Sequence, residues 1–144
     1  MVEPALFGPI DAILAPVVGY VVLLLVLVNL LTRYLANRSH RSQAEDGPEA
    51  VTRYLPHEAS NVLLVLGSFY YLTLHHHSGI VLSVLVLGTV LADFFEFEAR
   101  RVEARQDLPI ELPKGAMVGS VLVFGYAAYL SVFFIVAPIW NAII

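Results

Sequence analysis

The chain of 144 residues has no cysteine, which excludes disulfides, thiolate metal sites, iron–sulfur clusters and thiol nucleophiles. It also has few charges. Only 14% of its residues are charged and 58% are hydrophobic, whereas about a quarter of a soluble domain is charged. Glycine-rich phosphate loops and a serine nucleophile with a matching base are missing from the sequence as well. These absences predict a membrane protein that is not an enzyme.

Lysine and arginine are missing from both termini and from the segment 75–79. All eight basic residues lie in two stretches, 33–53 and 100–114. Because cytoplasmic loops of membrane proteins collect Lys and Arg, we expect both long loops inside and both termini outside the cell. The net charge of −4, with acids interleaved among the arginines, argues against nucleic acid as a partner.

Four apolar runs occupy most of the chain, and a helix needs roughly 20 apolar residues to cross about 30 Å of hydrocarbon. We therefore predict an all-α polytopic membrane protein, an antiparallel four-helix transmembrane bundle. Residues 1–144 should form a single membrane domain, in which Pro16 bends the first helix. The expected helices lie at about 9–36, 57–74, 80–105 and 114–137, with inner loops at 37–56 and 106–113.

Polar residues interrupt the second and third runs near the predicted inner boundary. The outer turn is short, so residues of these two helices whose numbers sum to roughly 154 should lie at one depth. This counting places Asn61 level with Asp93 and Glu58 level with Glu96, with His57 close by. Asn29 and Thr32 could approach the same level from the first helix.

Two interpretations of this cluster are open. A charge at membrane depth costs at least ~2.5–3.5 kcal/mol, so Asp93 and Glu96 need partners. In the favoured interpretation the cluster is structural, and Arg33 or Arg100 neutralises the acids. An amide at position 93 should then be tolerated. In the alternative, Asp93 and Glu96 form a proton or cation site. Transport would require polar groups that continue outward, and the helices offer few.

Three consecutive histidines form the expected outer turn. Imidazole binds transition metals and titrates near neutral pH, so a metal-responsive or pH-responsive turn is a weaker alternative. Adjacent side chains point apart, and only His75 and His77 could share one side of an extended turn. We favour solvated interfacial histidines and expect no cofactor.

Small residues line the start of the fourth run, at Gly115, Gly119 and Ser120. Small side chains at this spacing let helices approach closely in lipid. The favoured interpretation is packing within the same bundle, and the alternative is a dimerisation face.

Several segments resemble a family of short, uncharacterised four-helix membrane proteins of halophilic archaea. The resemblance is carried by Gly67-Ser68-Phe69-Tyr70-Tyr71, by Asp93-Phe94-Phe95-Glu96-Phe97-Glu98-Ala99-Arg100 and by Tyr126-Ala127-Ala128-Tyr129. The use of seven Arg to one Lys agrees with it. The resemblance implies an archaeal plasma membrane and a salty setting, but no activity.

The sequence as a whole predicts a non-enzymatic structural or accessory protein of the membrane. Its expected partners are the lipid bilayer and either further copies of itself or other membrane subunits. The alternatives are a small proton or cation transporter and a protein that responds to metal or pH through its histidines.

Overall fold

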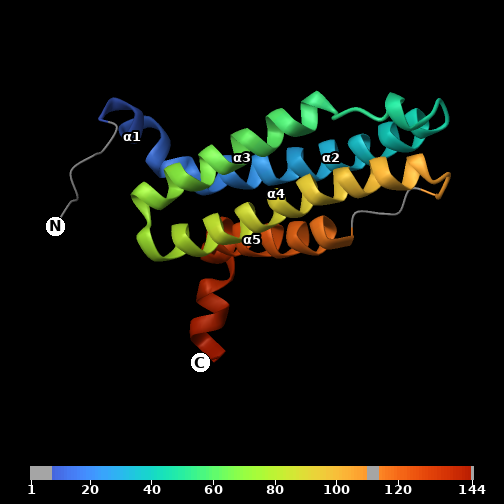
Figure 1. The fold of residues 1–144 in the computed structure, drawn as a ribbon. Helices are drawn as coiled ribbons and strands as arrows, with labels where there is room; N and C mark the ends of the chain where they lie inside the picture. Colours follow the sequence, from blue (N-terminus) through green and yellow to red (C-terminus); the bar gives the residue numbers. More distant parts are fainter. Residues whose placement is uncertain (1–7, 110–113, 144) are drawn as a thin grey trace.

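The computed structural model describes residues 8–109 and 114–143, and every regular element in those residues is helical. The predicted all-α class is confirmed for this part of the chain. Figure 1 shows the long helices lying side by side in one bundle. In chain order the elements are α1 Pro9–Leu14, the 3-10 helix η1 Ala15–Val17, α2 Val18–Ala44, the 3-10 helix η2 Pro48–Ala50, α3 Leu55–Leu74, α4 His76–Arg105 and α5 Lys114–Ile143.

The first apolar run is bent and is longer than predicted. A 3-10 turn separates α1 from α2 at Pro16, where the missing N–H interrupts the helical hydrogen bonding. Helix α2 continues to Ala44 instead of ending near residue 36. Its polar end remains helical because it packs on the end of α4, where the rings of His40 and Phe97 lie 5.1 Å apart.

The connection between α3 and α4 is tighter than the predicted turn at 75–79. His75 alone is extended, and helix α4 begins at His76 rather than near residue 80. Gly79 is needed here, because a Cβ at this position would lie 2.8 Å from the backbone nitrogen of Leu72. The two helices therefore lie antiparallel and in direct contact from their first turn. Residues 110–113 of the second predicted loop lie outside the described residues.

The four long helices form a closed ring of neighbours. Helix α2 packs against α3 and α5, and α4 packs against the same two helices. Between them lies a core of small and branched apolar side chains. Its buried members are Val18, Val22, Val26, Leu64, Tyr71, Leu82, Val86, Val123 and Ala127.

The outer surface of the bundle is also apolar, and every long helix contributes to it. More than half of the side-chain surface is exposed at Leu24, Leu31, Val62, Leu63, Leu66, Val84, Leu91, Val118 and Val121. Among the described residues, three stretches are long and apolar enough to cross a membrane, Pro9–Ala44, His76–Arg105 and Lys114–Val132. These three stretches indicate membrane association.

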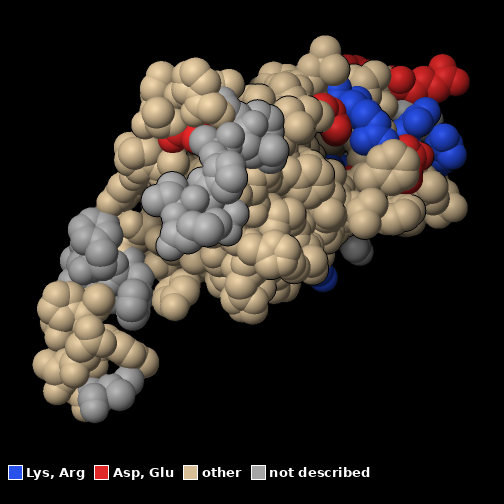
Figure 2. Space-filling model, turned by 90° about the vertical axis from the view of Figure 1, so that its left-hand side faces the viewer, with Lys and Arg blue, Asp and Glu red and all other residues tan. Residues whose placement is uncertain are grey.

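Charged residues gather in one region of the surface, as Figure 2 shows, and most of the rest of the visible face carries no charge. In the sequence these residues belong to the ends of α2 and α4 and to the segments that follow them. At the opposite end, the last part of α5 turns away from the bundle (Figure 1), and Pro138 lies inside this helix.

Candidate functional site

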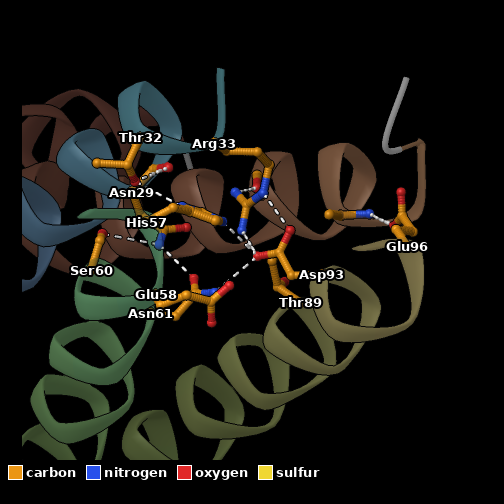
Figure 3. Close-up of polar contacts among 12 residues, drawn as sticks. Asn29, Thr32, Arg33, His57, Glu58, Ser60, Asn61, Thr89, Asp93 and Glu96 are labelled. Atoms are coloured by element: carbon orange, nitrogen blue, oxygen red, sulfur yellow. Dashed lines mark hydrogen bonds and ion pairs between the residues drawn. The ribbon is translucent and has the colours of Figure 1, made fainter. Parts of the chain in front are cut away.

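A buried ion pair joins α2 to α4 near the centre of the polar region shown in Figure 3. Arg33 Nε donates to Asp93 Oδ1 at 3.0 Å, and Arg33 Nη2 donates to Oδ2 at 2.5 Å. The two residues are only 4% and 8% exposed. Two parallel charge-assisted hydrogen bonds of this kind fix both the distance and the orientation of the partners.

Helix α3 reaches the same carboxylate with two further donors. His57 Nε2 lies 3.0 Å and Asn61 Nδ2 3.3 Å from Asp93 Oδ2. The other imidazole nitrogen of His57, Nδ1, lies 2.8 Å from Thr32 Oγ1 on α2. The Thr32 hydroxyl itself donates to the backbone oxygen of Asn29 at 3.0 Å, so both ring nitrogens of His57 and the hydroxyl of Thr32 have partners.

The remaining contacts extend this arrangement to every long helix. Asn29 Nδ2 donates to Asn61 Oδ1 at 2.8 Å and to Ser60 Oγ at 3.1 Å. Arg33 Nη1 donates to Ser120 Oγ of α5. We call this buried set the polar network; it comprises Asn29, Thr32, Arg33, His57, Ser60, Asn61, Asp93 and Ser120.

The structure brings together three of the five residues of the predicted cluster, Asp93, Asn61 and His57. Glu96 lies apart from them in Figure 3, and its Oε1 accepts the backbone N–H of Ala116 at 2.7 Å. A carboxylate there satisfies a free N–H in the first turn of α5 and stabilises its positive end. Glu58 points away as well and lies 3.5 Å from Arg53.

Arg33 and Ser120 gave too little signal in the sequence to be assigned to one contact. Arg33 comes at the end of an apolar run and also fits an interfacial arginine. The available signal was the helical spacing of Asn29, Thr32 and Arg33, with Asn37 one turn beyond Arg33, which gives α2 one polar face inside an apolar helix. Arg100, the other expected neutraliser, contacts His40 instead, at 3.1 Å.

A family model described as "Domain of unknown function (DUF7313)" matches residues 3–144. The chain belongs to this family. No curated protein and no solved structure matches the chain. Membership of DUF7313 thus assigns no activity to the polar network, and its role has to be argued from its geometry.

The small residues of α5 face the interior of this DUF7313 bundle. A Cβ on Gly119 would lie 3.1 Å from Thr89 Cβ and 3.3 Å from Thr89 Cα on α4. A Cβ on Gly115 would lie 3.0 Å from Glu96 Oε1. Ser120 contacts Arg33 of α2. The predicted packing face is therefore occupied by helices of the same chain.

The histidines lie between α3 and α4, far from the polar network along the helices. The ring of His75 packs on Tyr71 at 4.8 Å between centroids, and His76 and His77 are exposed in the first turn of α4. Within the part of the chain that the structure describes, no three His, Asp or Glu side chains are grouped as a metal site.

The polar network adjoins tightly packed apolar residues. Val26, Leu64 and Val86 are each at most 2% exposed. The gap that Asn29, Thr89 and Ser120 share with this core is too small to hold a water molecule, with a volume of about 0 Å³. The network can therefore hold four helices together, and its carboxylate already accepts from three residues, Arg33, His57 and Asn61.

Proposed function

We propose that this protein is a non-enzymatic structural or accessory protein of the membrane, built as a four-helix transmembrane bundle. The observation that carries the proposal is the polar network, because it joins all four long helices inside an envelope of apolar side chains. Lipid tails drive helices together weakly, so directional contacts of this kind fix which helices pack and at what depth.

Helix α3 is not among the three strongly apolar stretches, so its place in the membrane is inferred from the directions of its side chains. Its polar side chains His57, Ser60 and Asn61 are all at most 5% exposed and turn inward. Its outward side chains include Val62 and Leu63, which are more than 50% exposed. Inside the bundle α3 thus presents an apolar face to lipid, and its 20 residues match one crossing.

The charge distribution supports an orientation with both termini outside. Helices α2 and α4 end among the basic residues, so both long connections would lie in the cytoplasm. The resemblance to proteins of halophilic archaea supports an archaeal plasma membrane. The extensive apolar outer surface suits lipid and also suits contact with further copies or other membrane subunits.

Transport is the competing function, and the packing argues against it. Asp93 is paired with Arg33, so the pair has no net charge to offer a cation. The core from Val26 to Val18 along α2 is apolar and buried on its inner side. A proton or cation would need polar groups along that route.

Flux measurements on the protein in liposomes test this choice. We expect no proton or sodium flux from the parent under a pH gradient or a membrane potential. Asp93→Asn is the informative variant, and Glu98→Gln, a half-exposed carboxylate of the same helix outside the polar network, is its matched control. Parent flux that persists in Glu98→Gln but disappears in Asp93→Asn, with circular dichroism showing that the variant remains folded, would establish transport instead.

Native mass spectrometry of protein extracted gently from its own membrane tests the accessory role. We expect a defined oligomer or a complex with another membrane subunit. A protein that is always monomeric would contradict that role.

A further inference from the structure

A cavity of about 270 Å³ lies between α2 and α5 on the flank of the bundle. Its walls are mostly apolar and include Leu30 and Tyr34 of α2 and Met117 and Val121 of α5. Water occupies about 30 Å³ per molecule in the liquid, so the space corresponds to roughly nine waters.

One side of the cavity carries an unused hydrogen-bond donor. Asn37 lines the cavity, is 8% exposed, and its Nδ2 has no partner among the described residues. Buried donors in proteins are nearly always paired. The acceptor for Asn37 is therefore expected to come from whatever fills the cavity. Arg33 and Ser120, which also line it, already bond to each other.

Two basic residues, neither of which lines the cavity, come one turn beyond its Asn37 end on α2 and α5. The contact between Arg33 and Ser120 sets the register of the antiparallel helices α2 and α5. Arg41 follows Asn37 by one turn, and Lys114 precedes Met117 by one turn, so they lie at similar levels. Both side chains are exposed. Along the bundle, the apolar part of the cavity is thus followed by the Asn37 donor, and two exposed cations come one turn beyond it.

We propose that this cavity holds an anionic phospholipid of the cytoplasmic leaflet. One hydrocarbon chain lies along Leu30 and Val121, an oxygen linking chain to glycerol accepts from Asn37, and the phosphate meets Arg41 and Lys114. Phospholipids present these same three features in this order along their length. The inference rests on the membrane placement in the proposed function and adds a specific ligand to it.

The test uses purified full-length protein, stripped of lipid in detergent, with phosphatidylglycerol or phosphatidylcholine added and bound lipids counted by native mass spectrometry. We expect one phosphatidylglycerol to be retained preferentially. Val121→Trp fills the cavity, and Val118→Trp places the same side chain at a similarly exposed position that does not line the cavity. We expect loss of the retained lipid in Val121→Trp and in Asn37→Leu, but not in Val118→Trp.

The charge contribution is tested separately with Arg41→Gln and Lys114→Gln. Each is expected to lower the preference for phosphatidylglycerol over phosphatidylcholine about fivefold. Equal retention by Val121→Trp and Val118→Trp would overturn the site. A dimer that Val121→Trp alone disrupts would show that a second copy is the occupant and would equally overturn it.

Extraction with alkaline carbonate separates this proposal from the one on which it rests. A parent protein that stays in the membrane pellet but retains no phosphatidylglycerol overturns the lipid site alone. A parent protein released by carbonate overturns the membrane placement and the lipid site together.

Discussion

Inside the bundle, the charge of Asp93 is neutralised by Arg33, and the charge of Arg33 is neutralised by Asp93. Both are buried, and two parallel hydrogen bonds join them. Removing one partner of a buried ion pair leaves a charge without compensation, whereas replacing both with apolar residues is often neutral. The sequence alone suggested that an amide at position 93 would be tolerated. The pairing with Arg33 reverses this expectation, because Asp93→Asn would leave a buried guanidinium unpaired.

We therefore expect Asp93→Asn and Arg33→Met each to lower the free energy of unfolding by about 3–5 kcal/mol. The double variant Arg33→Met/Asp93→Leu should recover part of this loss, because it removes both charges but leaves His57 and Asn61 without their acceptor. Unfolding in mixed micelles with increasing denaturing detergent measures the effect. Arg105→Gln is the control, since this exposed arginine at the end of α4 lies outside the polar network and should change the free energy of unfolding by at most about 0.5 kcal/mol. Single variants as stable as the parent would contradict the assignment.

At the scale of the helices, α5 packs closely on α4 for two reasons. It lacks a side chain at the point of contact, and it also makes direct contacts with α4. Gly119 lets the backbone of α5 approach Thr89, and Glu96 accepts the N–H of Ala116 one turn earlier. Small residues at a helix interface are the usual means of close packing in lipid. Gly125 lies on the same helix and has open space around it, because nothing lies within 4 Å of a Cβ at that position.

This difference between two glycines gives a matched test. Gly119→Leu should destabilise the bundle by about 1–3 kcal/mol through overpacking against α4. Gly125→Leu adds the same side chain where it faces open space and should leave the stability unchanged. Thermal melting in one detergent compares the two variants. If both melt like the parent, α5 does not pack through Gly119.

The helices were predictable from the sequence because apolar runs and proline positions are local signals. The ends of the helices were less predictable. The extension of α2 beyond residue 36 depends on the distant Phe97, which packs on His40. The sequence places Glu96 with Asp93 because residues three apart on a helix lie on the same face. Its actual partner is the start of α5, and that approach depends on the tertiary packing of α5 on α4.

At the scale of the whole molecule, the distribution of charge defines two different ends. The ends of α2 and α4 carry the basic residues, and the connection at His75 carries none. From this distribution, the positive-inside rule predicts that the basic end lies in the cytoplasm.

Single cysteines can test this orientation, because the natural chain has none. Cysteine at Ser42 or Gln106 should be shielded from an impermeant thiol reagent in intact cells, whereas cysteine at His77 should be labelled. All three side chains are exposed in the structure, so differences in labelling report the membrane side and not burial. Labelling at Ser42 and Gln106 but not at His77 would invert the topology.

The inward-facing polar side chains of α3 also bear on how the protein is made. During synthesis α3 emerges before α4, at a time when Asp93 does not yet exist to accept from His57 and Asn61. Helix α2 is already made and can pair with Ser60 and with Asn61 Oδ1, but His57 Nε2 and Asn61 Nδ2 would still face hydrocarbon, which is costly without hydrogen-bond partners. We expect α3 to remain outside the bilayer until α4 has been synthesised. The two helices should then enter together as a hairpin closed at His75. A nascent chain ending after Leu74 should therefore leave α3 open to protease, and one ending after Arg105 should protect it.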